Sequence, residues 1–160
     1  MVSEGDEAPD FTAPLANGEL DTFTLSEALD EGGGPIVLAF FPGAFTSTCT
    51  HEMNTFQDRL ESLTAHGGRL YGVSIDSPFS LNEFRDQLGL SFGLLSDVNR
   101  DLVRAYDVAG DFEDIGIRDI AQRSVFVIDE SGTITYAWVA EDLGREPDYD
   151  AVEAAVGDAA

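Results

Sequence analysis

A short apolar run that passes directly into an amphipathic segment constrains the fold more than any other feature of this chain. Residues 35–41 are rich in β-branched and aromatic side chains and lie between Gly32-Gly33-Gly34 and Pro42-Gly43, which predicts a buried strand. Apolar residues then recur at helical spacing up to Gly67-Gly68, at Met53, Phe56, Leu60 and Leu63. A buried strand followed at once by a helix is the repeating unit of an α/β sheet.

The only cysteine of the sequence, Cys49, lies where this strand gives way to the helix. Unpaired backbone N–H groups and the positive end of the helix dipole favour a thiolate there. A free thiol titrates near about 8.5, and helix N-termini and nearby cations lower that value, so the position favours a reactive sulfur. The alternative is that Cys49 is a small buried apolar residue, and that the hydroxyls at positions 46–48 are ordinary helix caps.

The remaining patterns continue the alternation of strands and helices. Asn17-Gly18 predicts an N-terminal hairpin. Two capping-box spacings, Thr24 with Glu27 and Ser80 with Glu83, predict two helix starts. Further strands are expected at 69–76, 92–95, 124–128 and 134–140, and further helices around 102–106 and after Pro147.

Residues 108–121 are acidic, contain glycine and show no period, which predicts an irregular loop. We find no linker, repeat or low-complexity segment, so residues 1–160 are expected to form one domain. Its predicted fold class is α/β, with a central mixed β-sheet, helices on both faces and an N-terminal hairpin.

Composition excludes several function classes. The 31 acidic residues face only 8 basic ones, all arginine, and the net charge of −23 argues against nucleic-acid binding. One cysteine excludes a disulfide within this sequence, and two histidines predict neither a metal site nor any other cofactor. His51 would point away from Cys49 along a helix, which argues against a cysteine-protease pair. No secretory signal or membrane span is visible, so a cytoplasmic protein is expected.

Two motifs carry a resemblance to a known family. Pro42-x-x-x-Thr46-x-x-Cys49, with Glu52 three positions later, resembles the active-site signature of the peroxiredoxins, thiol peroxidases on a thioredoxin-like scaffold. Residues 123–129 are similar to the family stretch in which an arginine, here Arg123, opens the strand before the terminal hairpin. The order of elements is similar to the peroxiredoxin fold over nearly the whole chain.

The resemblance implies a role for each signature residue. Cys49 would attack a hydroperoxide, and Arg123 would stabilise both the thiolate and the developing negative charge. Thr46 would bond the peroxide, Pro42 would shield the sulfur, and Glu52 would hold Arg123 through a bidentate pair. The alternative for Arg123 is a surface arginine at the end of a strand.

The chain departs from many peroxiredoxins in lacking a second, resolving cysteine. In the group related to bacterioferritin comigratory protein that cysteine often lies five positions after the first, where this sequence has Asn54. The chain thus resembles a one-cysteine peroxiredoxin, reduced by thioredoxin, glutaredoxin, a small thiol or a second subunit. The alternatives are a thioredoxin-like binding or redox-sensing module without significant turnover and, less compatible with one cysteine, a dithiol oxidoreductase.

Two surface features lead to further expectations. Phe45 and Phe79 lie outside the predicted strands, where they would contribute either to a homodimer contact or to ordinary packing. The acidic composition resembles that of cytoplasmic proteins from extreme halophiles. Because molar salt shortens the Debye length to about 3 Å and screens self-repulsion, we expect the fold to weaken as salt is removed.

Overall fold

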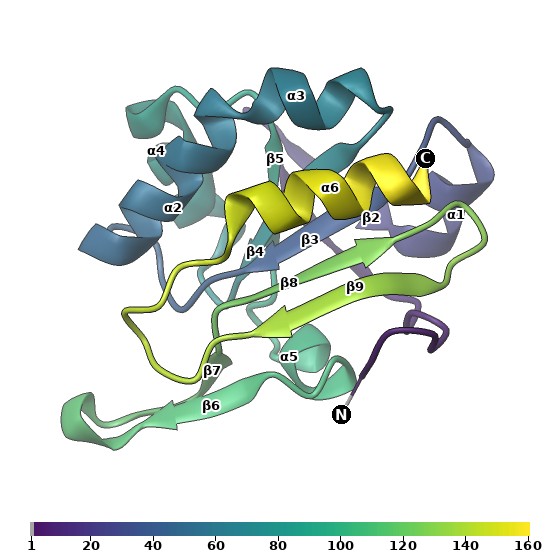
Figure 1. The fold of residues 1–160 in the computed structure, drawn as a ribbon. Coiled ribbons are helices and arrows are strands. Elements are labelled where there is room, and N and C mark those ends of the chain that lie inside the picture. The colour runs from purple at the N-terminus through teal and green to yellow at the C-terminus, as the bar shows by residue number, and fades with distance from the viewer. Residues whose placement is uncertain (1) are drawn as a thin grey trace.

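The protein is built on a mixed β-sheet, as the computed structural model, which describes residues 2–160, shows (Figure 1). Its seven strands lie in the order β2-β1-β5-β4-β3-β8-β9. They are β1 (Thr12–Ala16), β2 (Leu20–Thr24), β3 (Ile36–Phe40), β4 (Arg69–Ser74), β5 (Gly93–Ser96), β8 (Ser124–Ile128) and β9 (Ile134–Val139). β4 is parallel to both β3 and β5, whereas the other pairs are antiparallel. The predicted mixed sheet and N-terminal hairpin are confirmed.

Helices cover both faces of the sheet, as predicted (Figure 1). One face carries α2 (Ser47–Asp58), α3 (Leu60–Ala65), α4 (Pro78–Leu88) and α6 (Tyr149–Ala159), and the other carries α1 (Leu25–Asp30) and α5 (Asp101–Ala105). Since successive side chains of a strand point to opposite faces, Leu38 and Phe40 of β3 pack in one core and Val37 and Ala39 in the other. Among residues 2–160, none of the helices combines the length and apolarity needed to cross a bilayer.

Two helix boundaries and two helix caps differ from the predicted ones. The helix expected to run on to Leu63 is interrupted at Arg59, whose backbone leaves helical geometry (φ −98°, ψ 2°) between α2 and α3. Neither predicted capping box forms. The Thr24 hydroxyl pairs with Thr12 across the hairpin at 2.8 Å, and α4 begins earlier than expected, capped by Ser77, which accepts from the Ser80 N–H at 3.2 Å.

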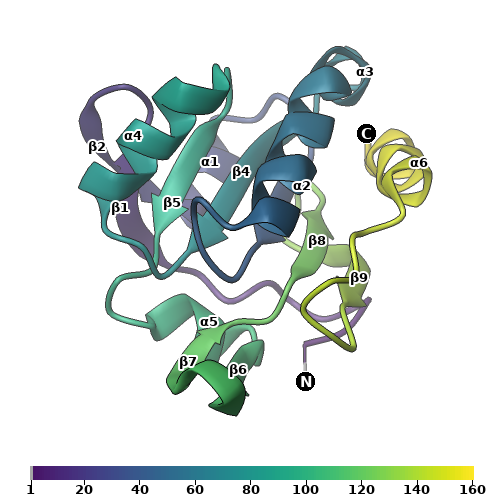
Figure 2. The ribbon, with the colours of Figure 1, turned by 90° about the vertical axis from the view of Figure 1, so that its left-hand side faces the viewer.

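The prediction of an irregular loop over 108–121 is wrong. The segment forms β6 (Ala109–Phe112), a 3-10 turn η1 (Glu113–Ile115) and β7 (Ile117–Ala121), and the two strands pair only with each other. A register shift between Gly110 and Phe112 breaks the alternation that would reveal a strand in the sequence. This hairpin lies at the same end of the molecule as the start of α2 (Figures 1 and 2).

Candidate active site

Cys49 is the third residue of α2, close to the end of β3 at which the chain turns into the helix. Its side chain is buried, with 1% of its surface exposed. Since the first N–H groups of an α-helix have no intrahelical acceptor, the sulfur lies among backbone donors at the positive end of the helix dipole. A thiolate is favoured at this place.

The turn that leads into α2 is held from two sides. The Ala44 N–H donates to Oδ2 of Asp76 at 2.8 Å, and the same oxygen accepts from the Ser74 hydroxyl at 2.6 Å. Phe45 has a left-handed backbone (φ 70°), which is unfavourable for an aromatic residue, and its ring packs edge-on against Phe84 with centroids 5.2 Å apart. The end of β4 and the face of α4 therefore maintain a backbone conformation that the turn would not adopt alone.

Pro42 and Thr46 both line the space next to Cys49. Pro42 is buried and contributes no N–H donor. Thr46 precedes the first residue of α2, but its hydroxyl donates to the Gly43 carbonyl at 3.0 Å instead of capping the helix. Its Oγ1 lone pairs can thus still accept a hydrogen bond from a bound molecule.

Arg123 lies against Cys49, although 74 positions separate them in the sequence. β3 and β8 pair with Phe40 opposite Ser124, so the residue before β8 lies beside the end of β3. Both terminal nitrogens, Nη1 and Nη2, are 3.4 Å from the Cys49 Sγ. Nη1 also donates to Oε1 of Glu52 at 2.5 Å, and Nη2 to the Leu143 carbonyl at 3.0 Å.

Glu52 does not make the expected bidentate pair with Arg123. Only Oε1 accepts from the guanidinium, and both Oε2 of Glu52 and Nε of Arg123 are buried without a partner within residues 2–160. Burial raises the pKa of Glu52 to about 8, against the opposing charge of Arg123. Burial by itself would lower the pKa of Arg123, but the charges of Glu52 and Cys49 raise it. Because Glu52 takes only one N–H of the guanidinium, both terminal nitrogens of Arg123 can still contact the sulfur.

A pocket of about 210 Å³ opens next to the sulfur. Its walls come from the turn, the start of α2, the β6–β7 hairpin and the loop between β9 and α6, all at the end of the molecule that faces the viewer in Figure 2. The lining residues are Pro42, Gly43, Thr46, Ser47, Thr48, Cys49, Phe112, Ile115, Ile117, Ile120, Arg123 and Leu143. Five of these residues were not predicted from the sequence to lie at the site: Phe112, Ile115, Ile117, Ile120 and Leu143. Their one signal is that large apolar side chains recur within otherwise acidic segments.

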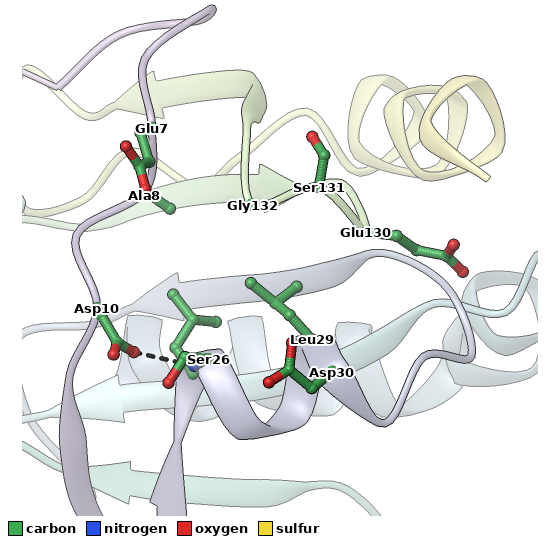
Figure 3. Close-up of a pocket in the computed structure, with 10 residues that line it drawn as sticks. Glu7, Ala8, Asp10, Ser26, Leu29, Asp30, Glu130, Ser131 and Gly132 are labelled. Carbon is green, nitrogen blue, oxygen red and sulfur yellow. Dashed lines mark hydrogen bonds between the residues drawn. The ribbon is translucent and has the colours of Figure 1, made fainter.

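A second pocket, of about 220 Å³, lies between α1 and the β8–β9 turn and has a different character (Figure 3). Four of its lining residues are acidic: Glu7, Asp10, Asp30 and Glu130. Figure 3 shows these carboxylates spread around the space instead of converging on one point. Over residues 2–160, no group of three or more His, Cys, Asp or Glu side chains is arranged to hold a metal ion. Cys49 and Arg123 line the first pocket, and neither of them lines this one.

Comparison with known proteins agrees with this geometry. The family model described as the AhpC/TSA family matches residues 4–137. A Mycobacterium tuberculosis protein named as a peroxiredoxin is 38% identical over 138 residues, which are 85% of this chain and 84% of that protein.

Two solved structures are similar over almost their whole length. The peroxidoxin BcpB of Mycobacterium tuberculosis has a TM-score of 0.84 at 25% identity, covering 98% of this chain and 97% of that one. The bacterioferritin comigratory protein of Xanthomonas campestris, studied for its alkyl peroxide reduction activity, has a TM-score of 0.78 at 29% identity, covering 92% and 90%. The sheet and helices described above are therefore those of a thioredoxin-like peroxiredoxin fold.

Proposed function

This chain belongs to the AhpC/TSA family of thiol-dependent peroxidases, and we propose that it reduces hydroperoxides by a one-cysteine mechanism centred on Cys49. The observation that carries the mechanism is the contact of both Arg123 terminal nitrogens with the Cys49 sulfur, 3.4 Å each, beside a pocket that can admit a substrate. A buried cysteine with a guanidinium on one side and helix N–H donors on the other is a site built for a thiolate.

In the first step, the Cys49 thiolate attacks one oxygen of the hydroperoxide in line with the O–O bond. A sulfur–oxygen bond forms, the O–O bond breaks, and the leaving oxygen takes up a proton to become water or an alcohol. Cys49 is oxidised to a sulfenic acid as the peroxide is reduced. Arg123 and the N–H groups of the first turn of α2 stabilise the negative charge that moves onto the oxygens.

Thr46, Pro42 and Glu52 support this step in different ways. The Thr46 hydroxyl, which donates to Gly43, accepts a hydrogen bond from the O–H of the peroxide and so orients it. Pro42 covers the sulfur and limits the access of water. Glu52 binds Nη1 of Arg123 and turns the guanidinium toward the sulfur.

The sulfenic acid must be reduced by a thiol from outside the chain, because this sequence holds no second cysteine. One external thiol condenses with the sulfenic acid, releasing water and forming a mixed disulfide. A second thiol attacks that mixed disulfide, which releases a disulfide between the two reductant sulfurs and regenerates the Cys49 thiolate. Thioredoxin, glutaredoxin or a small thiol are the candidate reductants, and this chemistry suits a reducing compartment such as the cytoplasm.

Rapid mixing of the reduced protein with hydrogen peroxide at high salt tests the proposed function. We expect a fast second-order reaction and, after trapping with a sulfenic-acid reagent, one adduct on Cys49 in the intact mass. A folded protein that reacts no faster than free cysteine would instead favour a thioredoxin-like binding or redox-sensing module.

The apolar pocket predicts a preference among hydroperoxides. Ile117 lies in the pocket wall and is 38% exposed, so it can contact the organic part of a substrate. Ile117→Ser is expected to lower the second-order rate constant for cumene hydroperoxide about three- to tenfold, as expected for a partly lost apolar contact. The rate constant for hydrogen peroxide, which has no apolar part, should stay the same. Leu20→Ser, at an exposed apolar residue of β2 that does not line this pocket, is the control. Equal losses for both peroxides would contradict the assignment.

Homodimerisation stays a prediction. Phe45 and Phe79 are 52% and 69% exposed, so both side chains remain available for a contact with a second copy near the active turn. Sedimentation of the wild-type protein and a Phe79→Ser variant would test it, since Phe79 has no ring partner among the described residues and is replaceable without damage to the core.

Salt dependence is the expected result of the net charge of −23. We propose that the protein is adapted to high salt and that its melting temperature rises by several degrees between dilute buffer and molar potassium chloride, because screening reduces repulsion among surface carboxylates. Sucrose at matched osmolality, which is excluded from the protein surface and screens no charge, should produce a smaller rise. A melting temperature that is the same in both salt conditions would contradict the adaptation.

A further inference from the structure

The loop between β9 and α6 holds Arg123 in place through a backbone carbonyl. The guanidinium makes four contacts from its two terminal nitrogens: two with Sγ, one with Glu52 and one with the Leu143 carbonyl. Since each terminal nitrogen carries two hydrogens, these four contacts involve all four terminal N–H groups of the guanidinium. Of the three partners, Cys49 and Glu52 are on α2, and only Leu143 lies on a different segment.

A competing arrangement of Arg123 is available in the same site. Oε2 of Glu52 and Nε of Arg123 are both buried and unpartnered within residues 2–160. A rotation of the guanidinium that brought a second N–H to Oε2 would form the favourable bidentate pair between Arg and a carboxylate. The same rotation would draw nitrogen away from the sulfur. The Leu143 carbonyl, which accepts a hydrogen bond from Nη2, opposes this rotation.

The loop that supplies this carbonyl has little packing of its own. Residues 141–145 are all exposed, Leu143 by 42%. At one end, the Ala140 N–H donates to the Arg123 carbonyl at 2.8 Å. Exposed segments with few apolar contacts open easily, so the position of the carbonyl depends on how the other end is tied down.

Glu146 provides that second tie. Its Oε1 accepts from the Tyr149 hydroxyl at 2.6 Å and lies 2.7 Å from Nδ1 of His51, on α2. The Tyr149 ring packs edge-on against Phe56 of α2, with centroids 5.1 Å apart. Burial disfavours the Glu146 carboxylate, but the bonds from Tyr149 and His51 outweigh that effect and lower its pKa. Glu146 thus attaches the loop to the helix that carries Cys49 and Glu52.

We propose that Glu146 is a positioning residue for peroxide reduction, which tethers the β9–α6 loop to α2 so that the Leu143 carbonyl keeps Arg123 on the sulfur and off Oε2 of Glu52. This inference rests on the proposed function. His51, whose Nδ1 lies 2.7 Å from Oε1 of Glu146, acts here as one of the two anchors of the tether.

Replacing Glu146 changes the rate of Cys49 oxidation in opposite directions, depending on whether the residue acts as a tether or only through its charge. Glu146 is close enough to Arg123 for their charges to interact, so removing its negative charge alone would favour the thiolate and speed oxidation. Loss of the tether would slow oxidation. Glu146→Ala is expected to lower the second-order rate constant with hydrogen peroxide about tenfold, as for one lost hydrogen bond to a charged group. Glu146→Gln, which keeps an acceptor oxygen for Tyr149 and His51 but loses the charge, should oxidise at least as fast as wild type.

Two further variants make the test specific. Glu141→Gln removes a carboxylate from the same exposed loop at a residue without a hydrogen-bond partner in the described chain, and should leave the rate unchanged. Glu52→Gln removes the bidentate alternative, so adding Glu146→Ala to it should cost little. The thiolate titration, followed by ultraviolet absorbance, should move to higher pH in Glu146→Ala and return toward its original midpoint in the double variant.

The inference is overturned if Glu146→Ala oxidises as fast as wild type, or if it loses as much activity in the Glu52→Gln background as in the native one. It is also overturned if Glu146→Gln slows as much as Glu146→Ala. A wild-type protein without peroxidase activity would instead refute the proposed function, so the two failures are distinguishable.

Discussion

Replacement of Cys49 by serine is expected to abolish peroxide reduction. The Cys49 sulfur can accept the peroxide oxygen and later release it as water when a thiol reduces the sulfenic acid, and a serine hydroxyl has no comparable oxidation chemistry. The rate of peroxide loss should fall to that of the buffer, and no sulfenic-acid adduct should appear in the intact mass.

The fold should survive this change because serine is nearly isosteric with cysteine and the new hydroxyl lies beside Arg123, which can donate to it. A buried polar group that finds a partner costs little, whereas an unsatisfied one costs about 1–3 kcal/mol. Circular dichroism and a thermal melt serve as the control for folding. A Cys49→Ser protein that retains peroxidase turnover would place the chemistry elsewhere and disprove the assignment of the nucleophile.

Replacement of Arg123 by alanine is expected to slow the oxidation of Cys49 by about two to three orders of magnitude, the usual effect of removing one donor that stabilises charge in a transition state. Arg123 is the only cation in contact with the sulfur among residues 2–160, and it is 2% exposed, so solvent cannot replace its charge. Rapid mixing measures the rate constant, and the thiolate absorbance measured against pH should show a midpoint shifted to higher pH.

The same substitution leaves Glu52 buried without its cation. Removing one partner of a buried ion pair costs about 3–5 kcal/mol, but because the pKa of Glu52 already lies near 8, the carboxyl can take up a proton and reduce that cost. In Arg123→Ala combined with Glu52→Gln, stability should return while activity stays low.

Arg123→Lys completes this set of variants. A lysine keeps the charge but lacks the fork that reaches Sγ, Glu52 and the Leu143 carbonyl together, so it should recover only part of the rate. If Arg123→Ala oxidised at the wild-type rate with an unchanged thiolate titration, the role of Arg123 would have to be abandoned.

Local patterns in the sequence were sufficient to predict much of this protein. The apolar run of β3 followed by the spacing of Met53 and Phe56 predicts a strand that enters a helix, and the structure has β3 and α2 there. The motif around Cys49 predicts the peroxiredoxin family, which the comparisons establish. These predictions succeed because strand and helix periods and the residues of a tight turn depend on neighbours in the chain.

Predictions that required knowledge of distant partners were less successful. The two capping boxes do not form because Thr24 has a better partner in Thr12 across the hairpin and α4 starts at Pro78, after Ser77. The hairpin of β6 and β7 was predicted as a loop because its strands are short, bulged and paired only with each other. Its isoleucines line the pocket beside Cys49, and the one signal of this in their own segment is that large apolar side chains recur among acidic residues.

Residue types at short, regular spacing were sufficient to predict the strand-to-helix unit, the candidate nucleophile and the family. Only the tertiary structure decided how Arg123 is held: by one oxygen of Glu52 and by the Leu143 carbonyl, with no bidentate pair. The physical reason is that a guanidinium with four terminal hydrogens chooses among all acceptors within reach. Which acceptors are within reach is set by the pairing of β8 with β3 and by the path of an exposed loop, and neither is encoded near Arg123 in the chain.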